Sequence, residues 1–190
     1  TSTGASLADM TGALQAIGTG NDDTPSGVLN IGFPFNFNGV NHTQFSASPD
    51  GWILLGGAAA ANQFTNLVTS TTNIPKIYPY WDDLATGTTG NVRYVVTGTA
   101  PNRILVVQWF VTIPRAVGGA ANSTFQLWLY ETTNAIEFRY GTMGAGAMTA
   151  SAGLTANATN FQSLTVATNT VSTTTPVDNN AGQPASGRLY

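Results

Sequence analysis

Three segments in the middle of the chain are so rich in β-branched and aromatic residues that they constrain the fold more than any other feature. They are Arg103–Ile113 (RILVVQWFVTI), Thr124–Glu131 (TFQLWLYE) and Ala135–Gly141 (AIEFRYG). The last two alternate apolar residues with polar or amphipathic ones at a period of two, which is typical of β-strands. The short link TTNA between them contains an Asn at a turn position and predicts a hairpin.

Further strand candidates separated by turn residues occur along the rest of the chain. They are Val28–Gly39, Thr43–Gly56, Asn73–Trp81, Asn91–Val96, Ser151–Ala156, Phe161–Ala167 and the closing GRLY. Many short strands at regular spacing predict an all-β fold, an antiparallel β-sandwich with little helix. Jelly-roll-like and immunoglobulin-like topologies both fit this pattern. The segment Gly56–Leu67 is the best helix candidate, with one or two turns expected.

The domain organisation expected from this pattern is one β-sandwich domain over residues 1–190. A length of 190 residues suits a single domain with a sizeable core. Residues 1–17 are predicted to form an extended or exchanged N-terminal strand. Residues 168–190, rich in Thr, Asn and Gly, are predicted to wrap the surface as an extended C-terminal segment.

Charged residues make up only 8% of the chain, against about 25% in ordinary globular domains. Interspersed charges normally keep soluble proteins apart, so a glycan coat, a place in a larger array or burial in an assembly is expected. The net charge is −3 and the few basic residues are scattered, which excludes a basic nucleic-acid footprint. No run approaches the roughly 18 apolar residues of a transmembrane helix, so membrane insertion is not expected.

The absence of cysteine excludes a disulfide framework and a Cys-based zinc site. An exported protein without disulfides is more typical of bacteria than of the animal secretory pathway. The first residues, TSTGASLADM, have neither a basic region nor an apolar signal core. Any export signal is therefore expected to have been removed or to lie outside this sequence.

Several landmarks, taken in order, resemble one known type of module. They are PSGVLNIGFPFNFNG, TQFSASPDGWILLG, IYPYWDDL, APNRILVVQW, STFQLWLYETTNAIEFRYG and PASGRLY. Together they resemble a β-sandwich module of secreted Bacteroidetes surface proteins associated with type IX secretion. More remotely, they are similar to the nidogen-like (NIDO) extracellular domain of animal matrix and adhesion proteins. The resemblance implies an exported, cell-surface module with structural or adhesive work, and it implies no catalytic residues.

One departure from those relatives concerns the end of the chain. The relatives usually continue beyond the GRLY-like segment into a final Phe-x-Pro, whereas this sequence stops at Tyr190. The last strand is therefore expected to be truncated or completed by something else.

Acidic residues beside turns are the candidates for chemistry. Adjacent residues of a strand point to opposite faces, so Asp82 and Asp83 are expected to hold a loop rather than to act as an acid/base pair. The alternative is a calcium site, because Ca²⁺ prefers carboxylate oxygens in flexible loops. Its candidate ligands are Asp22, Asp23, Asp50, Asp82 and Asp83. No other cofactor is expected.

Catalysis is not expected from this sequence. The only histidine is His42, and no GxSxG elbow or phosphate-binding loop accompanies it. A single histidine without cysteine also builds no zinc site.

Two other surface features have both a functional and a plain structural interpretation. Asn41, Asn122 and Asn157 each begin an Asn-x-Ser/Thr sequon, although a chain rich in Asn and Thr contains such triplets by chance. Trp128 and Tyr130 share one face of their strand and are candidates for stacking on sugar rings. The alternative is that both faces of this strand are covered.

The function favoured by these features is that of a non-catalytic extracellular module, the subunit of a surface fibre or an adhesin. Unpaired groups at sheet edges accept strands from neighbours unless charges block them, and this chain has few charges. Residues 1–17 are expected to complete the sheet of an adjacent copy, with Leu7, Met10, Leu14 and Ile17 as anchors. The principal partner is then another copy of the chain. The alternative is a lectin-like module that binds surface glycans, with Ca²⁺ as its candidate cofactor.

Overall fold

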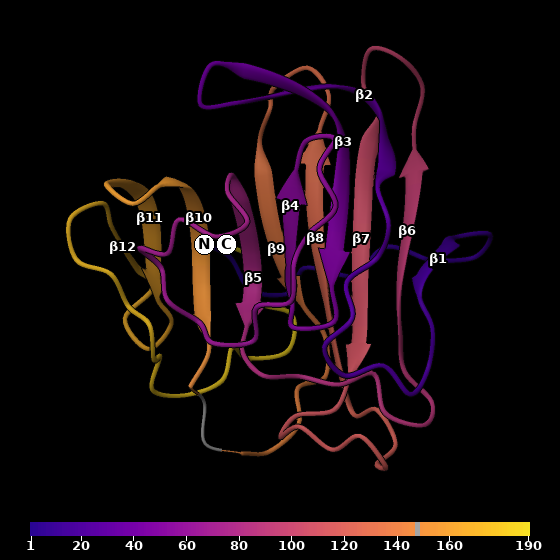
Figure 1. Cartoon of the computed structure of the whole chain (residues 1–190), viewed down its shortest axis with the longest axis vertical. Helices are drawn as coiled ribbons and strands as arrows, with labels where there is room; N and C mark the ends of the chain where they lie inside the picture. The colour runs from indigo at the N-terminus through magenta and orange to yellow at the C-terminus, as the bar shows by residue number, and fades with distance from the viewer. Residues whose placement is uncertain (147–148) are drawn as a thin grey trace.

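The chain folds into two antiparallel β-sheets that lie face to face as an open sandwich (Figure 1). The structure is a computed structural model and describes residues 1–146 and 149–190. Within these ranges all regular structure is β-strand, so the all-β sandwich prediction is confirmed. The described residues include no helix long and apolar enough to cross a membrane.

The smaller sheet has five strands in the order β1-β6-β7-β8-β9. Their bounds are Leu14–Ile17 (β1), Asn91–Thr97 (β6), Ile104–Val111 (β7), Ser123–Tyr130 (β8) and Ile136–Tyr140 (β9). The hairpin predicted at TTNA joins β8 to β9, with Leu129 opposite Ile136. Asn134 has a positive φ of 52°, a conformation that Asn adopts more readily than most residues, which explains its place in this turn.

The larger sheet has seven strands in the order β12-β11-β10-β5-β4-β3-β2. Their bounds are Leu29–Phe37 (β2), Val40–Ser48 (β3), Trp52–Leu55 (β4), Lys76–Trp81 (β5), Ser151–Asn157 (β10), Asn160–Thr165 (β11) and Thr170–Ser172 (β12). In Figure 1, β11 and β12 lie at the left of the molecule and β1 and β6 at the right.

Aromatic residues fill the centre of the space between the sheets. Trp109 of β7 stacks on Phe125 of β8 at 5.3 Å between ring centroids, and Tyr80 of β5 packs on the same Phe125 at 5.5 Å. Trp109 Nε1 donates to Ser48 O across the sandwich at 2.7 Å, and Tyr140 Oη donates to Pro79 O at 2.6 Å. These two bonds fix how the sheets face each other, since a buried indole or phenol donor needs a partner.

The helical turns expected over Gly56–Leu67 are wrong. This segment is a loop on the outer side of the larger sheet, where the indole Nε1 atoms of Trp52 and Trp81 both donate to Gln63 O. Two of its backbone donors are satisfied by side chains, since Ala60 N donates to Ser46 Oγ and Ala61 N donates to Asn73 Oδ1. A helix would have required those donors for its own carbonyl groups.

The two ends of the chain pair with each other and with the small sheet. The last residues lie beside β9, because Phe138 and Tyr190 exchange backbone hydrogen bonds of 2.9 and 3.0 Å. Ser2 and Leu189 form the next antiparallel pair outward. From there the N-terminal segment crosses the outer face of the small sheet, over Gln126 and Arg139, and then forms β1 at the opposite edge of that sheet.

A first prediction concerns Gly51, in the turn between β3 and β4. Gly51 has φ of +80°, and a Cβ there would lie 1.8 Å from Tyr80 O. Gly51→Ala is expected to lower the free energy of unfolding by about 3 kcal/mol, through backbone strain and a clash with a buried strand. Gly27→Ala is the control, since its Cβ would have no atom within 4 Å. Equal urea-unfolding midpoints for the two variants would contradict this account of the turn.

Candidate functional site

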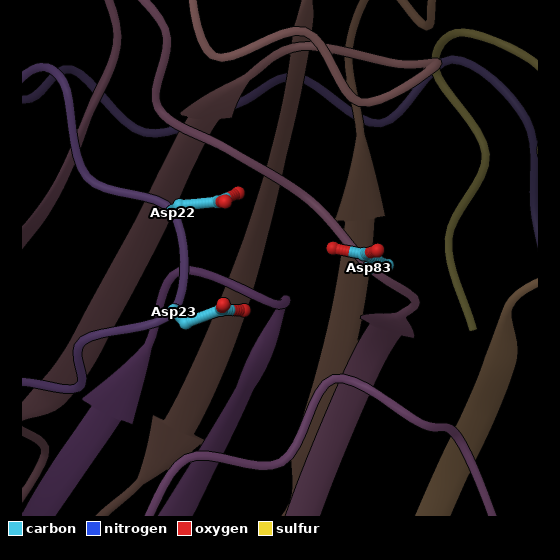
Figure 2. Close-up of side chains that lie close together, drawn as sticks. All are labelled: Asp22, Asp23 and Asp83. Carbon is cyan, nitrogen blue, oxygen red and sulfur yellow. The ribbon is translucent and has the colours of Figure 1, made fainter.

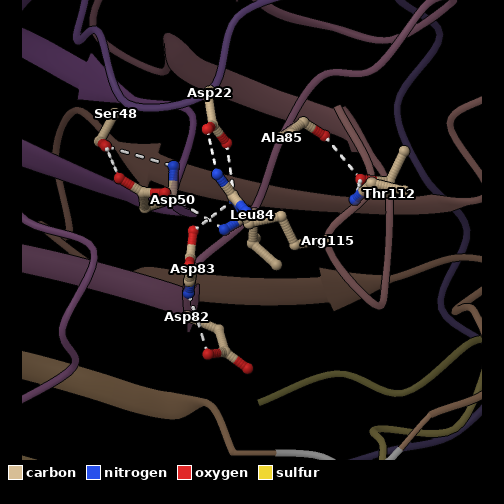
Figure 3. A network of polar contacts seen from close by, with 10 residues as sticks. Asp22, Ser48, Asp50, Asp82, Asp83, Leu84, Ala85, Thr112 and Arg115 are labelled. Carbon is tan, nitrogen blue, oxygen red and sulfur yellow. Dashed lines mark hydrogen bonds and ion pairs between the residues drawn. The ribbon is translucent and has the colours of Figure 1, made fainter. Parts of the chain in front are cut away.

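The predicted acidic residues gather at the end of the sandwich where β5 leads into the loop toward β6, and Asp50 is the most buried of them (Figure 3). Ser48 Oγ donates to Asp50 Oδ2 at 2.9 Å, and Leu84 N donates to Oδ1 at 3.2 Å. Asp50 O also accepts from Asp82 N at 3.3 Å. Asp50 therefore connects the β3–β4 turn to the segment that follows β5.

Burial raises the pKa of Asp50 from 3.8 to about 8. The nearby carboxylates of Asp23 and Asp83 add to this rise, while the two hydrogen bonds from Leu84 and Ser48 oppose it. The carboxyl group is therefore mostly protonated at neutral pH and offers no charge to a cation there.

Asp22, Asp23 and Asp83 converge, with one carboxylate oxygen of each lying within 4.8 Å of the others (Figure 2). Arg115 is the cation of this cluster. Its Nε donates to Asp22 Oδ1 at 2.7 Å, its Nη2 donates to Asp22 Oδ2, and Nε lies 2.9 Å from Asp83 Oδ1. The pKa of Asp83 is raised by partial burial, an effect that Arg115 opposes.

Asp82 lies apart from this cluster. Its Oδ1 accepts from Asp83 N at 2.9 Å, and its Oδ2 accepts from Thr149 Oγ1 at 2.9 Å. The two neighbouring aspartates therefore hold different segments, and their carboxylates serve no common site.

The cluster supplies three of the five carboxylates predicted to bind calcium. A Ca²⁺ ion takes about six to eight oxygen ligands, and Arg115 already lies between Asp22 and Asp83. Asp23 Oδ1 is buried and has no hydrogen-bond partner among the described residues. Calcium binding by these residues stays a prediction.

The second predicted site, Trp128 and Tyr130, lies on the outer face of the small sheet. Their ring centroids are 6.3 Å apart, and both side chains are half-buried. The Arg139 guanidinium lies 3.5 Å from the Trp128 ring centroid and pairs with Glu137 at 2.6 Å. One face of the indole is therefore already occupied by a cation.

The predicted anchors of the N-terminal segment lie in different surroundings. Ile17 is buried in the main core, Leu7 and Met10 are half-buried, and Leu14 is 60% exposed. Leu7 lies over Gly141, where an added Cβ would come within 2.7 Å of its Cδ1.

The three sequon asparagines are all exposed. The side-chain amide of Asn122 pairs with both backbone polar groups of Ile113, at 2.8 and 2.9 Å, so a glycan on its Nδ2 would break that pairing. Asn157 uses its Oδ1 to accept from Thr159 and Asn160. Glycosylation at any of the three stays a prediction.

Three residues that matter in the structure were not singled out from the sequence. Arg115 lies in a loop and gives no signal of its acidic partners. Gln126 is fully buried on the outer face of β8 and binds the N-terminal segment. Lys76 is the only lysine of the chain and begins the apolar strand β5. A lone lysine in such a strand was a usable signal, because lysine is almost never fully buried.

A second prediction follows from the raised pKa of Asp50. The unfolded chain ionises this group near pH 3.8 and the folded chain near pH 8, so the folded state holds more protons and loses stability as pH rises through that window. Asp50→Asn removes the loss, because the carboxamide carries no charge: its Oδ1 can still accept from Leu84 N, and its Nδ2 can donate to Ser48 Oγ in place of the bond that Oδ2 accepts. The variant is expected to gain stability over the natural protein, by a few kcal/mol in order of magnitude, between pH 5 and pH 9.

Urea unfolding at a series of pH values measures this difference. Asp9→Asn is the control, because Asp9 is fully exposed and its pKa is lowered by the Thr11 backbone N–H, so it stays ionised across the window. A difference between Asp50→Asn and the natural protein that does not change with pH would mean that Asp50 ionises normally.

Comparison with known proteins identifies the family of this chain. A family model described as NIDO related matches residues 1–190, the whole chain. No curated protein and no solved structure matched in the corresponding searches. NIDO-related domains are generally extracellular, non-catalytic modules. The chain thus belongs to the NIDO-related family.

Proposed function

We propose that this chain is a non-catalytic, exported structural module that assembles with copies of itself into a surface fibre or adhesin. The context we infer is that of Bacteroidetes surface proteins exported by the type IX route, on the sequence resemblance described above. The low charged fraction of 8% supports self-association, since few charges keep copies apart.

The observation that carries the proposal is that the N-terminal segment lies at both edges of the small sheet. Ser2 pairs with Leu189 outside β9, and β1 pairs with β6 at the opposite end. No described strand pairs with the outer side of either. The segment can therefore leave without breaking the order β6-β7-β8-β9, and a neighbour's segment can take its place.

The surface beneath this segment is shaped to hold an extended peptide. The buried side-chain amide of Gln126 accepts from Ala8 N at 2.8 Å and donates to Ala8 O at 3.0 Å. Arg139 Nη1 donates to Ser6 O at 3.0 Å, and Gly141 leaves room for Leu7. Contacts to backbone atoms like these are equally available to the same segment of another copy, which is the basis of strand exchange.

Other parts of the molecule favour assembly at this sheet rather than at the edge strand β2. There, Arg103 Nη1 donates to Gly32 O at 2.7 Å, Asn36 N donates to Asn134 Oδ1 at 2.8 Å, and Pro34 has no N–H. These features block β2 in the ways that natural edge strands are usually blocked.

An apolar groove beside Thr1 adds to the surface available for association. It has a volume of about 270 Å³ and is lined mainly by apolar side chains, among them Ile136, Phe138, Leu154, Leu164, Val171 and Tyr190. Val171 is 61% exposed. The groove lies where β10–β12 extend beyond β9, so it is the uncovered end of the sandwich interior.

A third prediction tests assembly and exchange together. Ser2→Cys with Leu189→Cys places the only two thiols of the chain on residues that face each other in an antiparallel pair. In filaments seen by electron microscopy, oxidation is expected to link each copy to the next and give a ladder on a non-reducing gel. Thr97→Cys with Ile104→Cys, opposite each other in the β6–β7 hairpin, is the control and should close within one chain.

Each result has a distinct meaning. Filaments whose Ser2→Cys and Leu189→Cys thiols close only within single chains would exclude exchange but leave assembly intact. A protein that stays monomeric by light scattering at high concentration would overturn the proposed function.

A second candidate function is glycan binding at the outer face of the small sheet. Its support is the half-exposed pair Trp128 and Tyr130 beside the Glu137–Arg139 ion pair, which together offer an aromatic surface and polar groups to a sugar. Trp128→Ala is expected to abolish binding on a glycan array, whereas Phe64→Ala, at a separate exposed aromatic residue, should not. Equal binding by the natural protein and Trp128→Ala would remove this candidate.

A further inference from the structure

The only lysine of the chain, Lys76, is 1% exposed and has no carboxylate partner among the ion pairs of the described residues. Its Nζ lies between two indoles, 3.7 Å from the Trp81 ring centroid and 4.8 Å from that of Trp52. Burying an ammonium group without a counter-ion is costly. Burial accordingly lowers the pKa of Lys76 from 10.5 to about 7, so a large share of the amine is uncharged near neutral pH.

Among the described residues, the one side chain to which Nζ is hydrogen-bonded is the carboxamide of Gln63. Nζ donates to Gln63 Oε1, and Asn73 Nδ2 donates to the same oxygen at 3.1 Å. Gln63 Nε2 donates to Ser70 Oγ at 2.8 Å, while Gln63 O accepts from both indoles. Every polar atom of this side chain is thus held in place against an amine that is partly uncharged, which is the arrangement of a nucleophile beside a fixed acyl group.

We propose that Lys76 and Gln63 form an intramolecular amide cross-link. The lone pair of the uncharged Nζ attacks Gln63 Cδ, and Asn73 Nδ2 stabilises the negative charge that develops on Oε1. The bond from Cδ to Nε2 then breaks, one proton from Nζ passes to Nε2, and ammonia leaves. Ser70 Oγ, which accepts from Nε2 at 2.8 Å, is placed to assist the protonation of the departing Nε2. No oxidant, reductant or further reactant is consumed.

The cross-link would have a clear structural role. It joins the loop between β4 and β5 to the first residue of β5, and it replaces a buried charge by a neutral amide. In a chain without cysteine it supplies the covalent closure that disulfides give many exported domains.

The single lysine makes the test unambiguous. The intact mass of the purified protein is expected to be lower than the sequence mass by one ammonia molecule. Because trypsin does not cleave after an acylated lysine, digestion of the unfolded protein should leave residues 1–93 as one fragment, although Lys76 would otherwise be cut. Amine labelling of the unfolded chain should modify the N-terminus alone.

Three variants separate the cross-link from the fold. Lys76→Arg keeps a cation between the indoles but has no amine to acylate, and Gln63→Met removes the carboxamide; both should show their full sequence masses. Ser70→Ala keeps both reacting groups and should slow the appearance of the lighter species. An intact mass equal to the sequence mass, with complete tryptic cleavage after Lys76 in protein incubated at pH 8, would overturn the proposal.

Discussion

The stacking of Trp109 on Phe125, with the indole donating to Ser48 O, is the contact on which the rest of the structure depends. It joins the centres of the two sheets and fixes the end of β3. Ser48 in turn bonds Asp50, and Asp50 holds Leu84 at the start of the loop that brings Asp83 to Asp22 and Asp23. The polar cluster at the end of the sandwich is therefore an extension of its aromatic core. Its electrostatics follow from that burial, since desolvation is the main cause of the raised pKa of Asp50.

The edges of the two sheets are protected from further strand pairing in different ways. At β2, side chains from turns of the other sheet occupy the exposed backbone groups, and Pro34 removes a donor. At the small sheet, the outermost positions are taken by the N-terminal segment, which is held largely through its backbone by Gln126 and Arg139. An edge covered by a removable segment is closed in a single copy and becomes available when that segment leaves. This difference is why the proposed assembly is assigned to the small sheet.

Much of the fold could be predicted because strand periodicity and turn residues are local signals. Arg103–Ile113, Thr124–Glu131 and Ala135–Gly141 became β7, β8 and β9 with boundaries shifted by one or two residues. The short strand β12 was not recognised as a strand, because a three-residue segment carries too little periodicity. Strand β1 covers only the last four residues of the strand that was predicted over residues 1–17. The helix expected at Gly56–Leu67 failed because its Ala-rich composition was outweighed by tertiary bonds to Trp52 and Trp81. For the acidic site, the convergence of three aspartates depends on which loops meet and where Arg115 lies, and neither is a local property.

The pairing of the two chain ends has a mechanical consequence. Ser2 lies opposite Leu189, and Ala5 N donates to Gly187 O, so the two ends run antiparallel and finish side by side. A force that pulls the two ends apart acts on this short ladder in the unzipping geometry, so its hydrogen bonds break one after another. In the shear geometry all of them would be loaded together. Each bond alone contributes only about 1 kcal/mol, so the terminal ladder would open under low tension while the aromatic core stays closed. Exchange of the N-terminal segment between copies would turn this weak ladder into a joint between subunits. The strand that pairs with Leu189 would then belong to the neighbouring copy, so a pulling force would be passed along the assembly.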